Sequence, residues 1–243
     1  MNKMRNVFAA VSLVLFACTA SGVATIPVPI LEDQPLRVGA QATASATFSP
    51  FALQRLDGIL GAAYAFGGGF EGGFNFRAGG IACALPACPG GQASPMLFDS
   101  AYQTDTVIGG DMVLRYLGNV TEFGNARDSL YLGLQAQVGY DYTFNQNSIA
   151  TASNVTAAVG VPLGIIFGSV AVYVMPEIDF GRRLSTTDGV FGSAVGLGGA
   201  VGTYISFGMV QTYLEVKPKS LNISDSSATN FAMDATLGLA LEI

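Results

Sequence analysis

The stretch from Ser129 to Phe144 alternates, residue by residue, between polar or small side chains and apolar ones. Because successive side chains of a β-strand point to opposite faces, this pattern predicts a strand with one continuous apolar face. A tilted strand crosses a bilayer with about 9–11 residues, so this segment is long enough to span a membrane. Its apolar positions are Leu130, Leu132, Leu134, Ala136, Val138, Tyr140, Tyr142 and Phe144.

The same period of two recurs along the chain. It is clear near the beginning, in 37–48, and in the last segment, from Phe231 to Ile243. Weaker alternation predicts strands at 58–66, 70–81, 104–116, 149–161, 167–180, 191–206 and 208–218. Together these segments predict about ten strands.

The scarcity of charge decides which way the apolar faces point. Only 12% of the residues are charged, whereas soluble domains have about a quarter. A soluble sandwich would need many more charged side chains to cover its outer face. In a membrane barrel the apolar face meets lipid and the sparse polar face meets the lumen. We therefore expect a lumenal network of paired charges, made of Arg37, Glu71, Arg77, Asp111, Arg115, Asp141, Glu177, Asp179, Glu215, Lys217 and Asp234.

The predicted fold class is all-β, a closed antiparallel transmembrane barrel. A sheet in hydrocarbon must close, because a free edge would leave backbone N–H and C=O groups without partners. The predicted connections at one end are short, at 67–69, 162–166 and 207, but 117–128 is longer. That exception keeps eight or twelve strands as alternatives to ten.

Residues 1–24 are predicted to be an export signal. Lys3 and Arg5 precede an apolar run from Val7 to Ala17 that is too short to cross a bilayer as a helix. Cleavage after Ala24 and after Ala20 are both consistent with the small residues there, and lipoprotein processing at Cys18 is a third alternative.

After the signal, we expect a periplasmic segment at 25–35 and the barrel at 36–243. Without the basic residues of the signal, nine basic and 17 acidic residues remain. This acidic balance argues against a nucleic-acid partner, which would require a basic patch.

The two cysteines beyond the signal, Cys83 and Cys88, flank four residues of a loop-like stretch. In an oxidising compartment they are expected to form a disulfide, with free thiols as the alternative. A metal site is not expected, because it would need about four ligands and the chain has no histidine.

The absence of histidine also bears on enzymatic activity. A serine nucleophile is usually activated by a histidine base, so the sequence favours a protein that is not an enzyme. The glycine pattern from Gly67 to Gly72 matches a dinucleotide-binding motif, but strand-like residues follow it rather than a helix. We interpret it as a hairpin turn and expect no cofactor.

The signal, the alternating segments, the unequal connections and the amphipathic last strand resemble small outer-membrane β-barrel proteins of Gram-negative bacteria. The resemblance covers residues 35–243 and concerns architecture, not one specific family. Proteins of this kind usually end in an aromatic residue, whereas this chain ends in Ile243. The resemblance implies an outer-membrane location and contact with outer-membrane lipid. Together with the absence of histidine, it favours a non-enzymatic role, either as a structural surface protein or as a narrow porin-like pore for small solutes.

Two alternatives belong to other classes. The 19 residues from Ala157 to Met175 contain no charge, which would suit a helical inner-membrane protein. However, several glycines and valines and Pro162 divide this stretch more naturally into two strands. The second alternative is a secreted soluble β-barrel that binds a small ligand.

Overall fold

The computed structural model describes residues 23–30, 34–49, 52–84, 105–124, 128–144, 151–186, 193–223 and 229–243. The strands in these ranges are β1 (Leu36–Ser49), β2 (Ala52–Gly67), β3 (Phe70–Ala84), β4 (Asp105–Glu122), β5 (Ser129–Phe144), β6 (Thr151–Gly160), β7 (Leu163–Phe167), β8 (Val170–Thr186), β9 (Ser193–Phe207), β10 (Val210–Ile223) and β11 (Thr229–Glu242). A short 3-10 helix, η1 (Val23–Thr25), precedes them.

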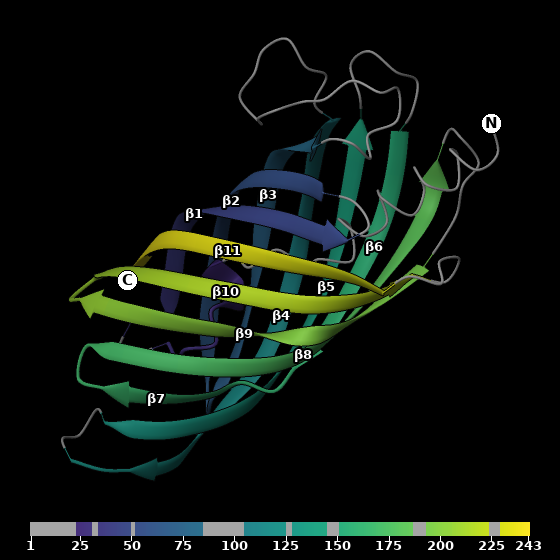
Figure 1. The fold of residues 1–243 in the computed structure, drawn as a ribbon. Coiled ribbons are helices and arrows are strands. Elements are labelled where there is room, and N and C mark those ends of the chain that lie inside the picture. Colours follow the sequence, from purple (N-terminus) through teal and green to yellow (C-terminus); the bar gives the residue numbers. More distant parts are fainter. Residues whose placement is uncertain are drawn as a thin grey trace, which may run out of the picture.

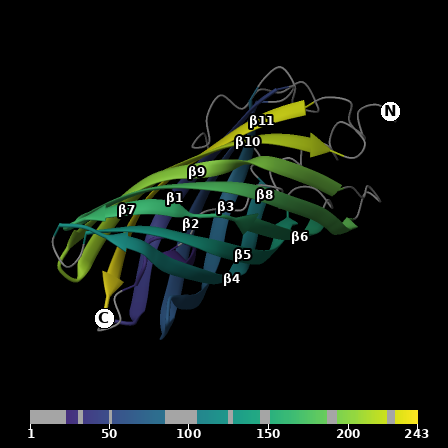
Figure 2. The same cartoon turned by 90° about the horizontal axis from the view of Figure 1, so that it is seen from below.

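The strands form one closed antiparallel sheet. Except for β6 and β7, which do not pair with each other, each strand pairs with its neighbours in the chain, and β1 pairs with β11 to close the ring. β6 and β7 both lie between β5 and β8, so they are two parts of a single wall strand. The barrel therefore has ten strands, as the sequence predicts (Figures 1 and 2).

Tight turns gather at one end of the barrel, together with the beginning of β1 and the C-terminus (Figure 1). The turn between β2 and β3 has positive φ at Gly68 and Gly69, which an ordinary L-residue would adopt only at a cost. The glycine pattern from Gly67 is therefore a hairpin turn. Gly168 and Gly208 begin the other two-residue turns, also with positive φ.

Two expectations about connections need correction. The predicted turn at 162–166 is wrong: β7 continues the strand, and the chain turns only after Phe167. Pro162 lies within the wall, where its carbonyl accepts a hydrogen bond from the Gly133 N–H at 2.9 Å. The long connection at 117–128 is partly strand, because β4 extends to Glu122.

The inner-membrane helix hypothesis is wrong, because the stretch from Ala157 to Met175 belongs to β6, β7 and β8. Among the described residues, no helix has the length and hydropathy that a bilayer crossing requires.

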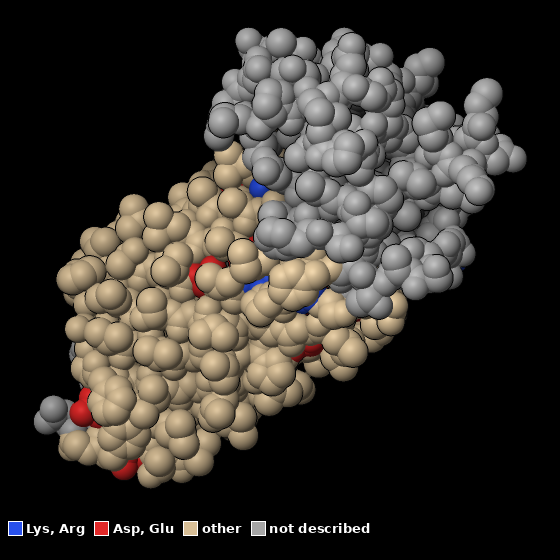
Figure 3. All heavy atoms as spheres, viewed as in Figure 1, with Lys and Arg blue, Asp and Glu red and all other residues tan. Residues whose placement is uncertain are grey.

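The outer surface is apolar. Leu132 and Leu134 are 45% and 54% exposed, and they point outward as the alternation predicts. The described surface in Figure 3 is almost free of charged residues. Aromatic side chains near strand ends, such as Phe66, Phe70 and Phe207, are also exposed. An exterior of this kind disfavours the soluble-barrel alternative, since soluble proteins rarely expose large apolar patches.

Residues 23–30 lie inside the barrel. Ala24, Thr25 and Ile26 are each only 1% exposed, and η1 packs against β1, β2, β3 and β4. The sequence predicts a periplasmic segment at 25–35, but the structure places its described residues through Ile30 in the lumen. Alternation cannot predict this position, because the contacts are made with side chains that are distant in sequence.

The apolar exterior predicts a cost for charge that depends on depth. Val138, in the middle of β5, and Val120, near the end of β4, are both 58% exposed. Val138→Arg should destabilise the barrel by about 2–4 kcal/mol in a bilayer, and Val120→Arg by roughly 0–1 kcal/mol. Reversible denaturant unfolding in lipid vesicles measures both. Equal costs would contradict a membrane-spanning outer face.

Candidate functional site in the barrel lumen

The inner face carries charged side chains at high density. Within the described residues, six basic and nine acidic side chains are buried, a net charge of −3. All eleven residues predicted for the lumenal network are among them. Four buried charged residues were not predicted: Arg55, Asp57, Lys219 and Glu242. Fourteen of these residues form three clusters, and the remaining one, Glu215, accepts a hydrogen bond from Tyr173.

The first cluster joins β2, β3, β4 and β5. Arg77 Nε donates to Asp141 at 2.7 Å, and Arg77 also lies 3.4 Å from Asp111. Arg55 pairs with Asp57 at 2.6 Å and approaches Asp141 at 3.7 Å. Two arginines therefore pair with three carboxylates, which lowers the cost of placing the charges inside the barrel.

The second cluster joins β8, β10 and β11. Lys217 Nζ donates to Glu177 at 3.2 Å. Lys219 Nζ lies 2.7 Å from Asp179 and 4.0 Å from Asp234. Both lysines and all three carboxylates are almost fully buried, so each charge depends on its partners.

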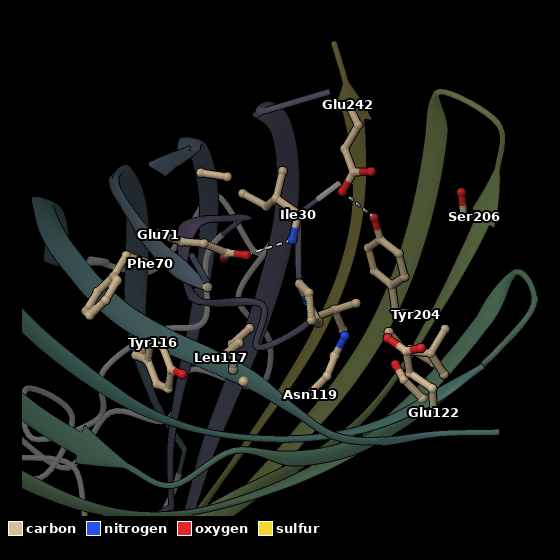
Figure 4. A pocket seen from close by; sticks show the side chains of 18 of the residues that line it. Ile30, Phe70, Glu71, Tyr116, Leu117, Asn119, Glu122, Tyr204, Ser206 and Glu242 are labelled. Atoms are coloured by element: carbon tan, nitrogen blue, oxygen red, sulfur yellow. Dashed lines mark hydrogen bonds between the residues drawn. The ribbon is translucent and has the colours of Figure 1, made fainter. Parts of the chain in front are cut away.

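The third cluster lies at the turn end of the barrel. Arg37 on β1 pairs with Glu242 on β11 at 2.6 Å, and the Tyr204 hydroxyl donates to the same carboxylate at 3.1 Å (Figure 4). Arg115 on β4 pairs with Glu71 on β3. These two arginines also donate hydrogen bonds to the segment at 23–30, and they thereby connect this segment to the barrel wall.

Tyrosines on the inner face pack over glycines of neighbouring strands. Tyr173 is directly paired with Gly202, and a Cβ at Gly202 would lie 2.3 Å from the tyrosine ring. Tyr213 and Gly238 form an equivalent pair between β10 and β11, as do Tyr131 and Gly164 between β5 and β7. The small lumenal residues on β9 therefore make room for large side chains from adjacent strands. Tyr173 also donates to Glu215 at 2.7 Å.

A cavity of about 500 Å³ opens at the turn end (Figure 4). One side is formed by Val28, Pro29 and Ile30, and the remainder by the ends of the wall strands. Glu71, Glu242 and Tyr204 line it, as does Ser129, the first residue of β5.

Several buried amide side chains have no hydrogen-bond partner among the described residues. In each of them, both the side-chain nitrogen and the side-chain oxygen are unpartnered. They are Gln41, Gln135, Gln137, Asn154 and Gln211, all with polar groups on the inner face.

The unpredicted charged residues reflect misplaced strand ends. The predicted strand at 58–66 excludes Arg55 and Asp57, whereas β2 begins at Ala52. The predicted strand at 208–218 excludes Lys219, whereas β10 ends at Ile223. Glu242 has the inward parity of the last strand, and this signal was sufficient to find it.

Cys88 lies outside the described residues, so its disulfide with Cys83 stays a prediction. Among the described residues, no group of three or more potential ligands could hold a metal ion.

The closed ring of antiparallel strands, the apolar exterior and the charged interior define a β-barrel of the outer-membrane type. No protein-family model matches the sequence, and the search of curated proteins found no match. The solved structures that are similar include the translocator domain of the autotransporter NalP from Neisseria meningitidis, with 9% identity, coverage of 88% of this chain and 90% of that chain, and a TM-score of 0.43. The outer membrane protease OmpT from Escherichia coli has 8% identity, coverage of 90% and 99%, and a TM-score of 0.41. Outer membrane phospholipase A from Escherichia coli has 11% identity, coverage of 96% and 98%, and a TM-score of 0.33.

The first cluster predicts a large stability effect from the loss of one arginine. Arg77→Met leaves Asp111 and Asp141 without their main buried partner and should cost about 3–5 kcal/mol. Arg182→Met is the matched control, because Arg182 is exposed on β8, and it should change stability by less than about 0.5 kcal/mol. Denaturant unfolding of both variants is the measurement. Similar effects of the two substitutions would refute the role of the cluster.

The lumenal position of Ala24 bears on where the signal is cut. The Ala24 N–H donates to Asn75 at 3.0 Å, and its carbonyl accepts from Arg115 at 3.0 Å. Cleavage after Ala20 keeps both contacts, whereas cleavage after Ala24 removes them and leaves an ammonium group on Thr25 near a buried arginine. We therefore predict a mature chain that retains Ala24, as cleavage after Ala20 or processing at Cys18 would give. Mass spectrometry of the purified protein should show this, and a mature chain that begins at Thr25 would contradict it.

Proposed function

We propose that this protein is a non-enzymatic, narrow, water-filled pore for small polar solutes in the outer membrane of a Gram-negative bacterium. The observation that carries the proposal is a continuous polar track on the inner face of β5. The track begins at Ser129 in the cavity and ends at Thr143 near the opposite end of the strand. Between them, the Tyr131 hydroxyl and both amides, Gln135 and Gln137, have no hydrogen-bond partner among the described residues.

Water in the lumen explains this track. A buried polar group without a hydrogen bond costs about 1–3 kcal/mol, so several unpartnered amides in a dry interior would be strongly destabilising. Ordered water commonly satisfies such groups when the site is polar. Because the unpartnered groups extend along most of β5, water that satisfies them would form a continuous path through the barrel.

The lumenal charge favours cations. The buried charged residues of the described strands sum to −3, so the potential inside attracts cations and repels anions. Small polar solutes would pass more easily than large ones, because the tyrosines and the segment at 23–30 narrow the passage. The Arg37–Glu242 and Arg115–Glu71 pairs lie at this constriction.

The outer face supports the membrane location and lipid as the main partner. It exposes large apolar side chains at alternate positions of the strands, as expected for a lipid-facing wall. The absence of histidine from the chain supports a non-enzymatic role.

A structural scaffold is the second candidate function. It is favoured by the tyrosine–glycine pairs, in which large side chains fill space in the lumen. A filled barrel would act as a membrane anchor for its connecting loops and would not conduct.

Single-channel recording in a planar bilayer separates the two candidates. The pore proposal predicts discrete conductance steps and a reversal potential that shows cation preference in a salt gradient. Replacing both Gln135 and Gln137 by Leu should reduce the conductance by removing polar groups from the track. Ala136→Leu, on the exposed outer face between them, should leave it unchanged.

The outcomes are distinct. An absence of steps from correctly folded protein, shown by different gel mobility before and after boiling, would refute the pore and support the scaffold. Equal conductance in the Gln135→Leu/Gln137→Leu variant and the parent would refute the track along β5.

A further inference from the structure

The segment at 23–30 is held in the lumen mainly through its backbone. Arg37 donates to the carbonyls of Val28 and Pro29 at 3.1 and 3.3 Å. Arg115 donates to the carbonyls of Ala24 and Ile26. All these bonds have a charged donor and a main-chain acceptor, which makes them stronger than bonds between neutral groups.

Two further side chains accept hydrogen bonds from the segment. Glu71 accepts from the Ile30 N–H at 2.7 Å (Figure 4), and Asn75 accepts from the Ala24 N–H at 3.0 Å. Arg37, Glu71, Asn75 and Arg115 thus provide donors and acceptors along the whole segment, from β1, β3 and β4. We refer to these four residues as the peptide clamp. None of these contacts involves a side chain of the segment.

The segment itself suits this environment. Pro27 and Pro29 have no N–H, so they bring no donor that would need a partner in the lumen. The Val28 N–H donates within the segment, to the Ile26 carbonyl at 2.9 Å. The side chains of Ile26 and Val28 join a buried apolar cluster of the wall, which includes Leu117, Tyr131, Tyr173 and Met175.

We propose that the peptide clamp is a binding site for short apolar peptides and that residues 23–30 are its resident ligand. Because the clamp contacts main-chain groups, it would tolerate changes of sequence among apolar residues. It would discriminate against peptides that lack the N–H groups that Glu71 and Asn75 bind. When the resident segment leaves, the site can accept a second peptide. The peptide site requires the closed barrel but not ion conduction, so it does not depend on the proposed pore function.

The test uses the complete mature protein with a weakened resident segment. In the Ile26→Lys/Val28→Lys variant, two ammonium groups would replace side chains of the apolar cluster, where burying a charge is costly, so the segment should leave the lumen. The ligand is a peptide with the sequence of residues 24–30 followed by a tryptophan, with its N-terminus acetylated so that the first residue keeps the amide N–H of Ala24. Since the chain has no tryptophan, fluorescence excited near the red edge of absorption reports the peptide alone.

The expected result is saturable binding to the lysine variant, with a blue-shifted emission. At the same micromolar peptide concentrations, the parent should not bind, because its tethered segment competes at an effective concentration on the order of millimolar. Empty vesicles of the same lipid measure partition of the peptide into the membrane.

Variants of the peptide test how it is recognised. Methylation of the nitrogen equivalent to Ile30 removes the donor to Glu71 and should weaken binding roughly tenfold or more. Exchanging Ile for Val and Val for Ile throughout the peptide keeps its backbone and apolar character, and should change the affinity within roughly threefold.

Three outcomes would overturn the proposal: no binding to the folded lysine variant, equal binding to the variant and the parent, or no effect of N-methylation. If the lysine variant does not show heat-modifiable gel mobility, Ile26→Gly/Val28→Gly removes the same packing without adding charge and is tested in its place. Conductance is recorded separately, so a protein that conducts without binding peptide refutes the peptide site alone. A protein that binds peptide without conducting refutes the pore alone.

Discussion

The pairing of β1 with β11 is the interaction on which the rest of the structure depends. Leu36 and Ile243 exchange backbone hydrogen bonds of 3.2 and 2.8 Å, and beside them Arg37 pairs with Glu242 across the same seam. Hydrocarbon offers no partner to a free strand edge, so an open sheet with this apolar outer face would not be stable in a membrane. Closure satisfies the edges and also creates an interior in which charged side chains can be enclosed.

Because the barrel is closed, the charged side chains inside it must have partners. Charges removed from bulk water are tolerated only with partners, and each buried arginine and lysine accordingly pairs with at least one carboxylate. Arg37 and Arg115 each bind a carboxylate of the wall and backbone carbonyls of the segment at 23–30. This shared use of the arginines explains how an apolar segment can occupy a charged lumen. It also connects the proposed pore with the proposed peptide site.

The alternation of apolar and polar residues predicts most of the wall strands correctly, because the outer face of each strand is apolar and the inner face is polar. The inward position of Glu177 and Lys217 follows from parity alone. Parity does not show where a strand ends, so Arg55 and Lys219 were assigned to loops. Proline in a strand is usually a sign of a turn, yet Pro162 lies within the wall, where its missing N–H removes one ladder bond and divides β6 from β7. The lumenal segment has no periodicity, and its contacts with Glu71 and Arg115 span more than 40 residues in sequence.

The central claim is that each strand has one face toward lipid and the other toward the lumen. Single tryptophans placed along β5, in a chain that has none of its own, test it through quenching by lipids with brominated acyl chains. The account predicts strong quenching at Leu132, Leu134 and Val138, and weak quenching at the intervening positions Gln135 and Gln137. Quenching that does not alternate along the strand, or that is stronger at the two glutamine positions, would contradict it.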